Sequence, residues 1–175
     1  MPIFQIIGKI IKILRSDGTP VQIAVGFSMG MMAGFIPFDT LHVILIWLGV
    51  IIFNVSFGAF LFGWIIFSGF AYLFDPLFHD LGYKILVDLS FLKGFFTWLS
   101  NTSILALTRF NNTVVMGSTI LSILLFVPLF FFIKYFVIYY REHIDAKIQK
   151  WKIIQSIKAS KLYKTYEKIK GWSEL

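Results

Sequence analysis

The chain has 175 residues, with 16 Lys and Arg against 9 Asp and Glu, and is 58% hydrophobic and 14% charged. Soluble domains are about half apolar and a quarter charged, so this composition excludes an ordinary soluble domain and predicts a membrane protein. The absence of cysteine from the sequence excludes disulfides, thiolate metal sites and a cysteine nucleophile.

The net charge of +7 is concentrated at the two ends of the chain. Basic residues exceed acidic ones within 1–20 and within 141–175, whereas the stretch between them carries equal numbers of both. Because basic segments stay on the cytoplasmic side, both ends are predicted to be cytoplasmic. An even number of membrane crossings follows.

Residues 1–16 are predicted to form an amphipathic helix. Apolar residues recur there at helical spacing, with Lys9, Lys12 and Arg15 among the remaining positions. Such a helix is expected to lie on the cytoplasmic membrane surface against anionic headgroups. A buried helix within the bundle is the alternative.

The start of the next helix has a clear sequence signal. Thr19 is suited to the N-cap, Pro20 to the first helical position, and Gln22 completes a capping box. The helix is predicted to cover 20–35 and to end before Pro37.

A second short helix is predicted over 40–53, with Asp39 as its N-cap. The helices 20–35 and 40–53 measure about 24 and 21 Å at 1.5 Å per residue, against a hydrocarbon core of about 30 Å. The pair is therefore either a re-entrant hairpin or two crossings of a thinned or protein-lined region.

Three glycines four residues apart, Gly26, Gly30 and Gly34, form a stripe of small residues on the first of these helices. Such a stripe lets another helix approach closely. Packing within the chain, against 40–53, is the favoured interpretation, and an oligomer interface is the alternative.

Asp39, His42 and Asn54 form a candidate polar intramembrane site. An ionisable pair at membrane depth suggests a proton site or a polar lining for an ion or headgroup. The alternative is structural, since Asp39 can serve as a helix cap and Asn54 as a turn residue.

Two longer spans are predicted over 55–74 and 114–140, within a membrane domain covering 17–140. The segment 75–112 between them is expected to lie on the outer leaflet as one or two helices, interrupted near Gly82 or Gly94. Its apolar residues keep a helical period at Leu77, Leu81, Ile85, Leu89, Leu92, Phe96 and Leu99.

Residues 141–175 are predicted to form a basic amphipathic tail in the cytoplasm. The tail either continues the last span or lies on anionic lipid, and the alternative is a solvated charged helix that only orients the protein. Its place beside a membrane exit favours lipid or a protein partner over nucleic acid. The candidate contact residues are Lys147, Lys150, Trp151, Lys152, Lys158 and Lys161.

The sequence contains no HExxH, GxSxG or Walker A motif, and its three histidines fall in different regions. We therefore expect no catalytic residue, no metal, no cofactor and no enzymatic activity.

Between Gly18 and Phe74 the chain has a distinctive set of residues, namely Thr19-Pro20, Ile23-Ala24, Gly26-Phe27, Gly30, Gly34-Phe35, Pro37, Leu41-His42 and Asn54. On these residues the region resembles a prokaryotic membrane-protein family known as domain of unknown function 2062. Asp39-Thr40 stand where this family has small residues, and Phe67-Ser68-Gly69 stand where it has an Asn-Pro pair. The resemblance implies a polytopic bacterial inner-membrane protein and no established activity.

Together these features predict an all-α integral membrane protein with about four membrane-embedded helices and cytoplasmic termini. The expected function is that of a small subunit or scaffold in an envelope or lipid-handling process, with a protein partner or a second copy of the chain. A small transporter or channel is the alternative, with its site at the broken helices around Pro37, Asp39 and His42.

Overall fold

The computed structural model describes Ile13 and residues 18–144. The helix expected over 1–16, apart from Ile13, lies outside the described residues, as does the tail from 145 onward with its six candidate contact residues. The chain divides into two compact units, Met1–Val137 and Ile138–Leu175. The regular elements of the described part are all helices, which confirms the all-α prediction.

Helix α2 (Pro20–Phe35) has the predicted bounds and the predicted cap. Thr19 Oγ1 accepts a hydrogen bond from the Gln22 N–H over 3.2 Å, and Gln22 Oε1 accepts one from the Thr19 N–H over 2.8 Å. The Gln22 amide also donates to the Asn54 carbonyl over 3.0 Å, and the Gln22 carbonyl accepts from the Ser56 N–H over 3.2 Å. The start of α2 is therefore tied to the turn that begins α4.

Helix α3 (Leu41–Ile52) begins one residue later than predicted. Its N-cap is Thr40, with φ −113° and ψ 146°, so the assignment of this role to Asp39 was wrong. The physical reason is that the Asp39 carboxylate pairs with Arg109, which is distant in sequence, and so does not cap the helix. The Thr40 hydroxyl donates to the Pro37 carbonyl over 2.9 Å instead of capping the helix.

Helix α4 (Phe57–Tyr83) is longer than the predicted span, because it continues through Pro76. The backbone is unbroken at Gly82, and the break falls at Leu89, where φ is −81° and ψ is 74°. Gly94 lies within α5, so neither glycine interrupts the segment. The elements that follow α4 are η1 (Lys84–Asp88), η2 (Ser90–Leu92), α5 (Lys93–Asn101), η3 (Leu105–Thr108), α6 (Thr113–Tyr139) and η4 (Tyr140–Ile144).

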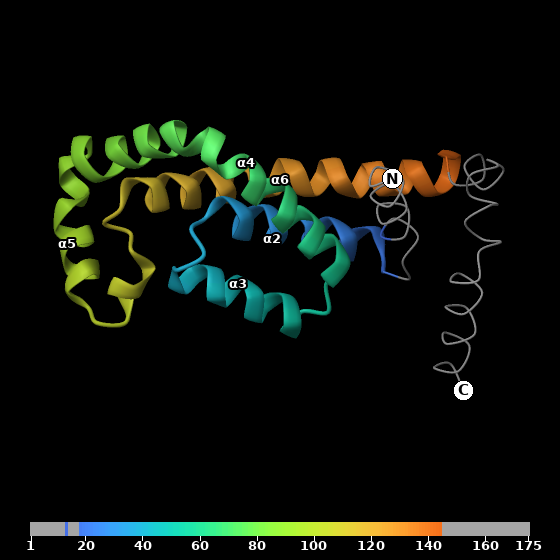
Figure 1. Cartoon of the computed structure of the whole chain (residues 1–175), viewed down its shortest axis with the longest axis horizontal. Coiled ribbons are helices and arrows are strands. Elements are labelled where there is room, and N and C mark those ends of the chain that lie inside the picture. Colours follow the sequence, from blue (N-terminus) through green and yellow to red (C-terminus); the bar gives the residue numbers. More distant parts are fainter. Residues whose placement is uncertain (1–12, 14–17, 145–175) are drawn as a thin grey trace. The chain divides into compact units, whose positions relative to one another are not determined.

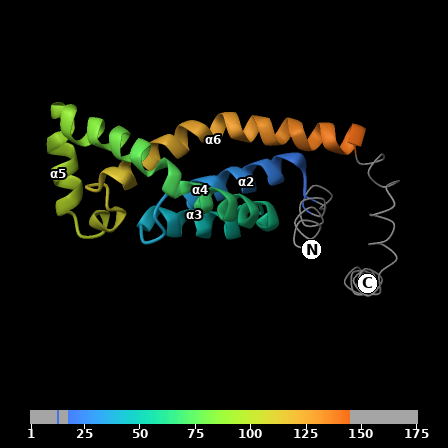
Figure 2. The same ribbon diagram turned by 45° about the horizontal axis from the view of Figure 1, so that its top comes forward.

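Helices α2 and α4 lie side by side (Figures 1 and 2), and the glycine stripe is their interface. A Cβ atom added to Gly26 would lie 2.5 Å from the Ser56 carbonyl, and one added to Gly34 would lie 2.9 Å from the Ser68 nitrogen. Gly63 of α4 faces the Phe27 carbonyl in the same way. The stripe thus packs within the chain as predicted, but against α4 instead of α3.

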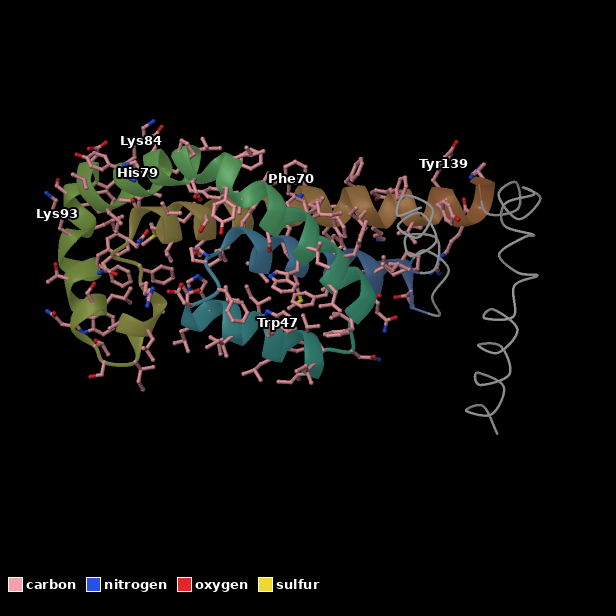
Figure 3. The ribbon with its side chains drawn as sticks, in the orientation of Figure 1. Trp47, Phe70, His79, Lys84, Lys93 and Tyr139 are labelled. Atoms are coloured by element: carbon pink, nitrogen blue, oxygen red, sulfur yellow. The ribbon has the colours of Figure 1, made fainter. Side chains whose placement is uncertain are left out.

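The position of α3 is set by side chains instead of backbone contact. Val43 and Val50 of α3 are buried against Ala33 and Ile36 from the α2 end and Phe60 from α4. The Trp47 ring makes an edge contact with the Phe60 ring at 4.8 Å, and its place in this cluster is visible in Figure 3. The α2–α3 pair is therefore a packed helical hairpin.

Helix α6 crosses α4 near the C-terminal end of α4, in the antiparallel sense, and their close contact spans about one turn of each helix. The backbone of Thr113 lies against Gly82, and the backbone of Phe78 lies against Gly117, so both contacts require a glycine. His79 Nδ1 lies 2.7 Å from Thr113 Oγ1 at the same crossing. These close contacts explain why α4 continues past its predicted end.

The two long helical segments, Phe57–Asp88 and Thr113–His143, are each long and apolar enough to span a membrane. Only 17% and 11% of their most apolar windows are buried inside the protein, whereas the core helix of a soluble protein is mostly buried. Large apolar side chains such as Phe70, labelled in Figure 3, and Leu124 are at least half exposed. Their exposed apolar surface is suited to contact with lipid.

Candidate functional site

The hairpin tip, residues 36–40, connects α2 to α3. Pro37 lacks an N–H group and ends the helical hydrogen bonding of α2, and Ile36 already has an extended backbone with φ −83° and ψ 134°. Asp39 of the tip contacts Arg109 in the loop before α6, and His42 in the first turn of α3 contacts Thr119 of α6 and Thr40 of the tip. We call Asp39, Thr40, His42, Arg109 and Thr119 the tip cluster.

His42 is the centre of the tip cluster. Its Nε2 lies 3.1 Å from Thr119 Oγ1 and 3.4 Å from Thr40 Oγ1. Because the Thr40 hydroxyl already donates to the Pro37 carbonyl, it can only accept a hydrogen bond from His42 Nε2, whereas the Thr119 hydroxyl can donate or accept one. The imidazole therefore has a hydrogen-bond partner at Nε2 in either tautomer.

The other side of the His42 ring is enclosed. The ring stacks on Phe110, with centroids 5.2 Å apart and an angle of 17° between the planes. Its Nδ1 atom is buried and has no hydrogen-bond partner among the described residues. A hollow of about 50 Å³ borders Phe110, enough for a few waters but not for a larger solute.

Asp39 and Arg109 form an ion pair across the edge of the cluster, 70 positions apart in sequence. Arg109 adopts a left-handed backbone with φ 55°, and its carbonyl accepts from the Asn112 N–H over 2.9 Å. Asn112 Oδ1 in turn accepts from the backbone N–H groups of Val114 and Val115 and caps α6. The ion pair thus joins the hairpin tip to the start of α6.

We expect the Asp39–Arg109 pair to contribute little to stability, because both side chains are 56% exposed. A double-mutant cycle with Asp39→Asn and Arg109→Gln should give a coupling energy below about 1 kcal/mol that decreases as salt is added. The coupling energy is measured by unfolding the detergent-solubilised native protein, the two single variants and the double variant. A salt-independent coupling of several kcal/mol would contradict this view of the pair.

The structure separates the third predicted site residue from the other two. Asn54 lies at the opposite end of α3 from the tip cluster, in the turn before α4, with φ 47°. Asparagine tolerates this left-handed conformation, which accounts for its presence in the turn. Asp39 and His42 are brought together, but Asn54 does not join them.

Four residues of the site were not predicted from the sequence, namely Thr40, Arg109, Phe110 and Thr119. Arg109 is the only cation between Lys93 and Lys134, and this isolation was a signal that it could pair with Asp39. Thr119 and Phe110 carry no such signal, since a hydroxyl or an aromatic ring in apolar sequence is common.

The described residues, Ile13 and 18–144, contain no group of three or more His, Cys, Asp or Glu side chains that could hold a metal ion. The tip cluster instead offers hydroxyls, one imidazole and one ion pair. Its chemistry is that of hydrogen bonding and of fixing one helix against another.

A family model matches residues 5–145, well beyond the 18–74 region in which the resemblance is visible by residue. No curated protein and no solved structure matches the chain. Since the matched region is most of the 175 residues, the chain belongs to the family described as "Uncharacterized protein conserved in bacteria (DUF2062)".

Proposed function

We propose that this protein is a non-catalytic subunit of the bacterial inner membrane that scaffolds an envelope or lipid-handling process. The observation that carries the proposal is the set of backbone contacts at Gly26, Gly30, Gly34, Gly82 and Gly117. They join α2 to α4 and α4 to α6 by direct contact of each glycine with backbone atoms of the neighbouring helix. Interfaces of this kind resist rearrangement, which suits a fixed platform on which other molecules assemble.

The proposed topology has four crossings, α2, α3, α4 and α6, with both termini in the cytoplasm. The α2–α3 hairpin contacts α6 near the tip, where His42 meets Thr119, and near its base, where Ile23 and Phe136 line one apolar hollow. Thr119 and Phe136 are separated by about 26 Å of helix, close to the roughly 30 Å of the hydrocarbon core. This length favours two crossings over a re-entrant hairpin.

The topology is tested by labelling single cysteines in intact cells, since the native chain has none. We expect Phe38→Cys and Ser103→Cys to react with an impermeant reagent from outside, and Phe53→Cys to react only after permeabilisation. Protection of position 38 alongside labelling of position 103 would instead establish a re-entrant hairpin.

The scaffold proposal is tested by mild cross-linking of the tagged protein in its native membrane, followed by purification. We expect a specific protein partner or a second copy of the chain to co-purify, together with anionic lipid. The partner should be retained with Asp39→Asn and reduced with Gly30→Ala, which disturbs the α2–α4 interface. Recovery of a monodisperse chain free of partners would count against a scaffold.

The second candidate is a small transporter or channel, and the buried, unpartnered Nδ1 atom of His42 favours it. Broken helices at membrane depth are a known way to build a substrate site. In liposomes, a transporter should lose proton- or substrate-linked flux with Asp39→Asn or His42→Gln. A scaffold should show no such flux with either the native chain or the variants.

A further inference from the structure

The segment between α4 and α6 is apolar and yet exposed. Lys84–Thr108 covers η1, η2, α5 and η3, and leaves seven large apolar side chains between 39% and 78% exposed. These are Val87, Leu89, Phe91, Phe95, Trp98, Ile104 and Leu107. Apolar surface of this extent in a short segment indicates contact with another apolar phase.

The helix α5 and the residues just before it have three distinct faces. An inward face includes the buried Leu99, an aromatic ridge is exposed, and a third face is polar. The inward face consists of Leu92, Phe96 and Leu99, the aromatic ridge of Phe91, Phe95 and Trp98, and the polar face of Lys93, Thr97 and Ser100.

The aromatic ridge differs from the apolar face that the sequence periodicity predicts. That periodicity selects Leu92, Phe96 and Leu99, which pack inward against the rest of the segment. The side chains of Phe91 and Trp98, by contrast, are 78% and 58% exposed. The fold therefore decides which of these two sets of apolar side chains is exposed.

The ridge and the polar face lie on opposite sides of α5. Successive residues turn by about 100° in a helix, so the ridge is centred roughly opposite Lys93. Figure 3 shows the Lys93 side chain directed away from the long helices, and Figures 1 and 2 show α5 running crosswise to α4 and α6. If α4 and α6 cross a membrane, α5 lies parallel to its surface, with Lys93 toward water and the ridge toward the bilayer.

We propose that the aromatic ridge inserts into the outer leaflet at the boundary between headgroups and acyl chains, so that its binding partner is phospholipid. Tryptophan and other aromatic residues favour this boundary. Lys84 and Lys93 then lie at headgroup level, where they attract lipid phosphate. A protein partner or a second copy is less suited to a helix whose opposite face is polar and directed to water.

The inference rests on the membrane location proposed above and adds to it a specific lipid contact. Its test uses spin labels at single cysteines in the purified full-length protein, reconstituted in vesicles of phosphatidylethanolamine and phosphatidylglycerol. Phe95→Cys and Trp98→Cys report on the ridge, and Lys93→Cys and Thr97→Cys report on the polar face. Leu124→Cys, on the exposed surface of α6, is the control for membrane insertion.

We expect labels at 95, 98 and 124 to be accessible to oxygen, which concentrates in lipid, and protected from a water-soluble nickel complex. Labels at 93 and 97 should show the reverse. If 95 and 98 are open to nickel while 124 is in lipid, the lipid contact is wrong and the membrane location stands. If 124 is also open to nickel, both proposals fail.

One further outcome would overturn the lipid proposal, and one further variant covers a failure to fold. Dipolar broadening between labels at 95 or 98, with low accessibility to both reagents, would identify a second copy as the partner and overturn the lipid proposal. Should a label at 98 prevent folding, Phe91→Cys, at the most exposed position of the ridge, reads the same face.

Discussion

Replacing Gly30 with alanine should lower the free energy of unfolding by about 1–3 kcal/mol, the range for overpacking a close interface. The added methyl group would collide with the Phe60 carbonyl and the Trp64 nitrogen of α4. Both are backbone atoms that cannot move without separating the helices. The change is measured by thermal unfolding of the detergent-solubilised protein, monitored as the loss of the monodisperse peak in size-exclusion chromatography.

The matched control is Gly69→Ala. Gly69 lies in the apolar helix α4, and nothing approaches a Cβ placed there within 4 Å. This substitution should leave the unfolding free energy unchanged or raise it slightly, because alanine has the higher helix propensity by about 1 kcal/mol. Equal effects of the two substitutions would contradict the assignment of the α2–α4 interface.

Replacing Gly82 or Gly117 with alanine should destabilise the α4–α6 crossing by a similar amount, again about 1–3 kcal/mol. The added methyl groups would meet the backbone of Thr113 and of Phe78, respectively. Since either substitution already moves the two helices apart, the double variant should lose less than the sum of the two single losses. Unfolding of the three variants by titration with denaturing detergent measures this.

The control for this pair is Gly94→Ala, because Gly94 lies in α5 and a Cβ atom placed there meets no other atom within 4 Å. It should behave like the native chain in the same titration. Strict additivity of the Gly82 and Gly117 effects would indicate that the two contacts are independent and that the helices do not move as a unit.

The two glycine interfaces also explain how the tip cluster is held. The α2–α4 contacts set the position of the hairpin, and the α4–α6 contacts set the position of Thr119. The packing of α2 and α6 on α4 helps to bring His42 and Thr119 together, as does the Asp39–Arg109 ion pair. Alanine variants at Gly30 or Gly117 should therefore disturb the tip cluster, although neither glycine belongs to it.

Some of the candidate site could be predicted from the sequence. Pro37, Asp39 and His42 interrupt an apolar stretch, and such an interruption is a local signal. Arg109, Phe110 and Thr119 could not be assigned to the site, because their proximity to the hairpin tip depends on contacts between helices far apart in sequence.

The sequence by itself determined the all-α class of the fold, the bounds of α2 and its cap at Thr19 and Gln22. These depend on composition and on hydrogen bonds within one turn, which neighbouring residues decide. Only the tertiary structure decided that the glycine stripe faces α4, where Gly63 leaves room for a backbone, and that α4 continues beyond Pro76 to reach α6. The tertiary structure also decided the role of Asp39, because its carboxylate pairs with the distant Arg109 and the N-cap of α3 is Thr40.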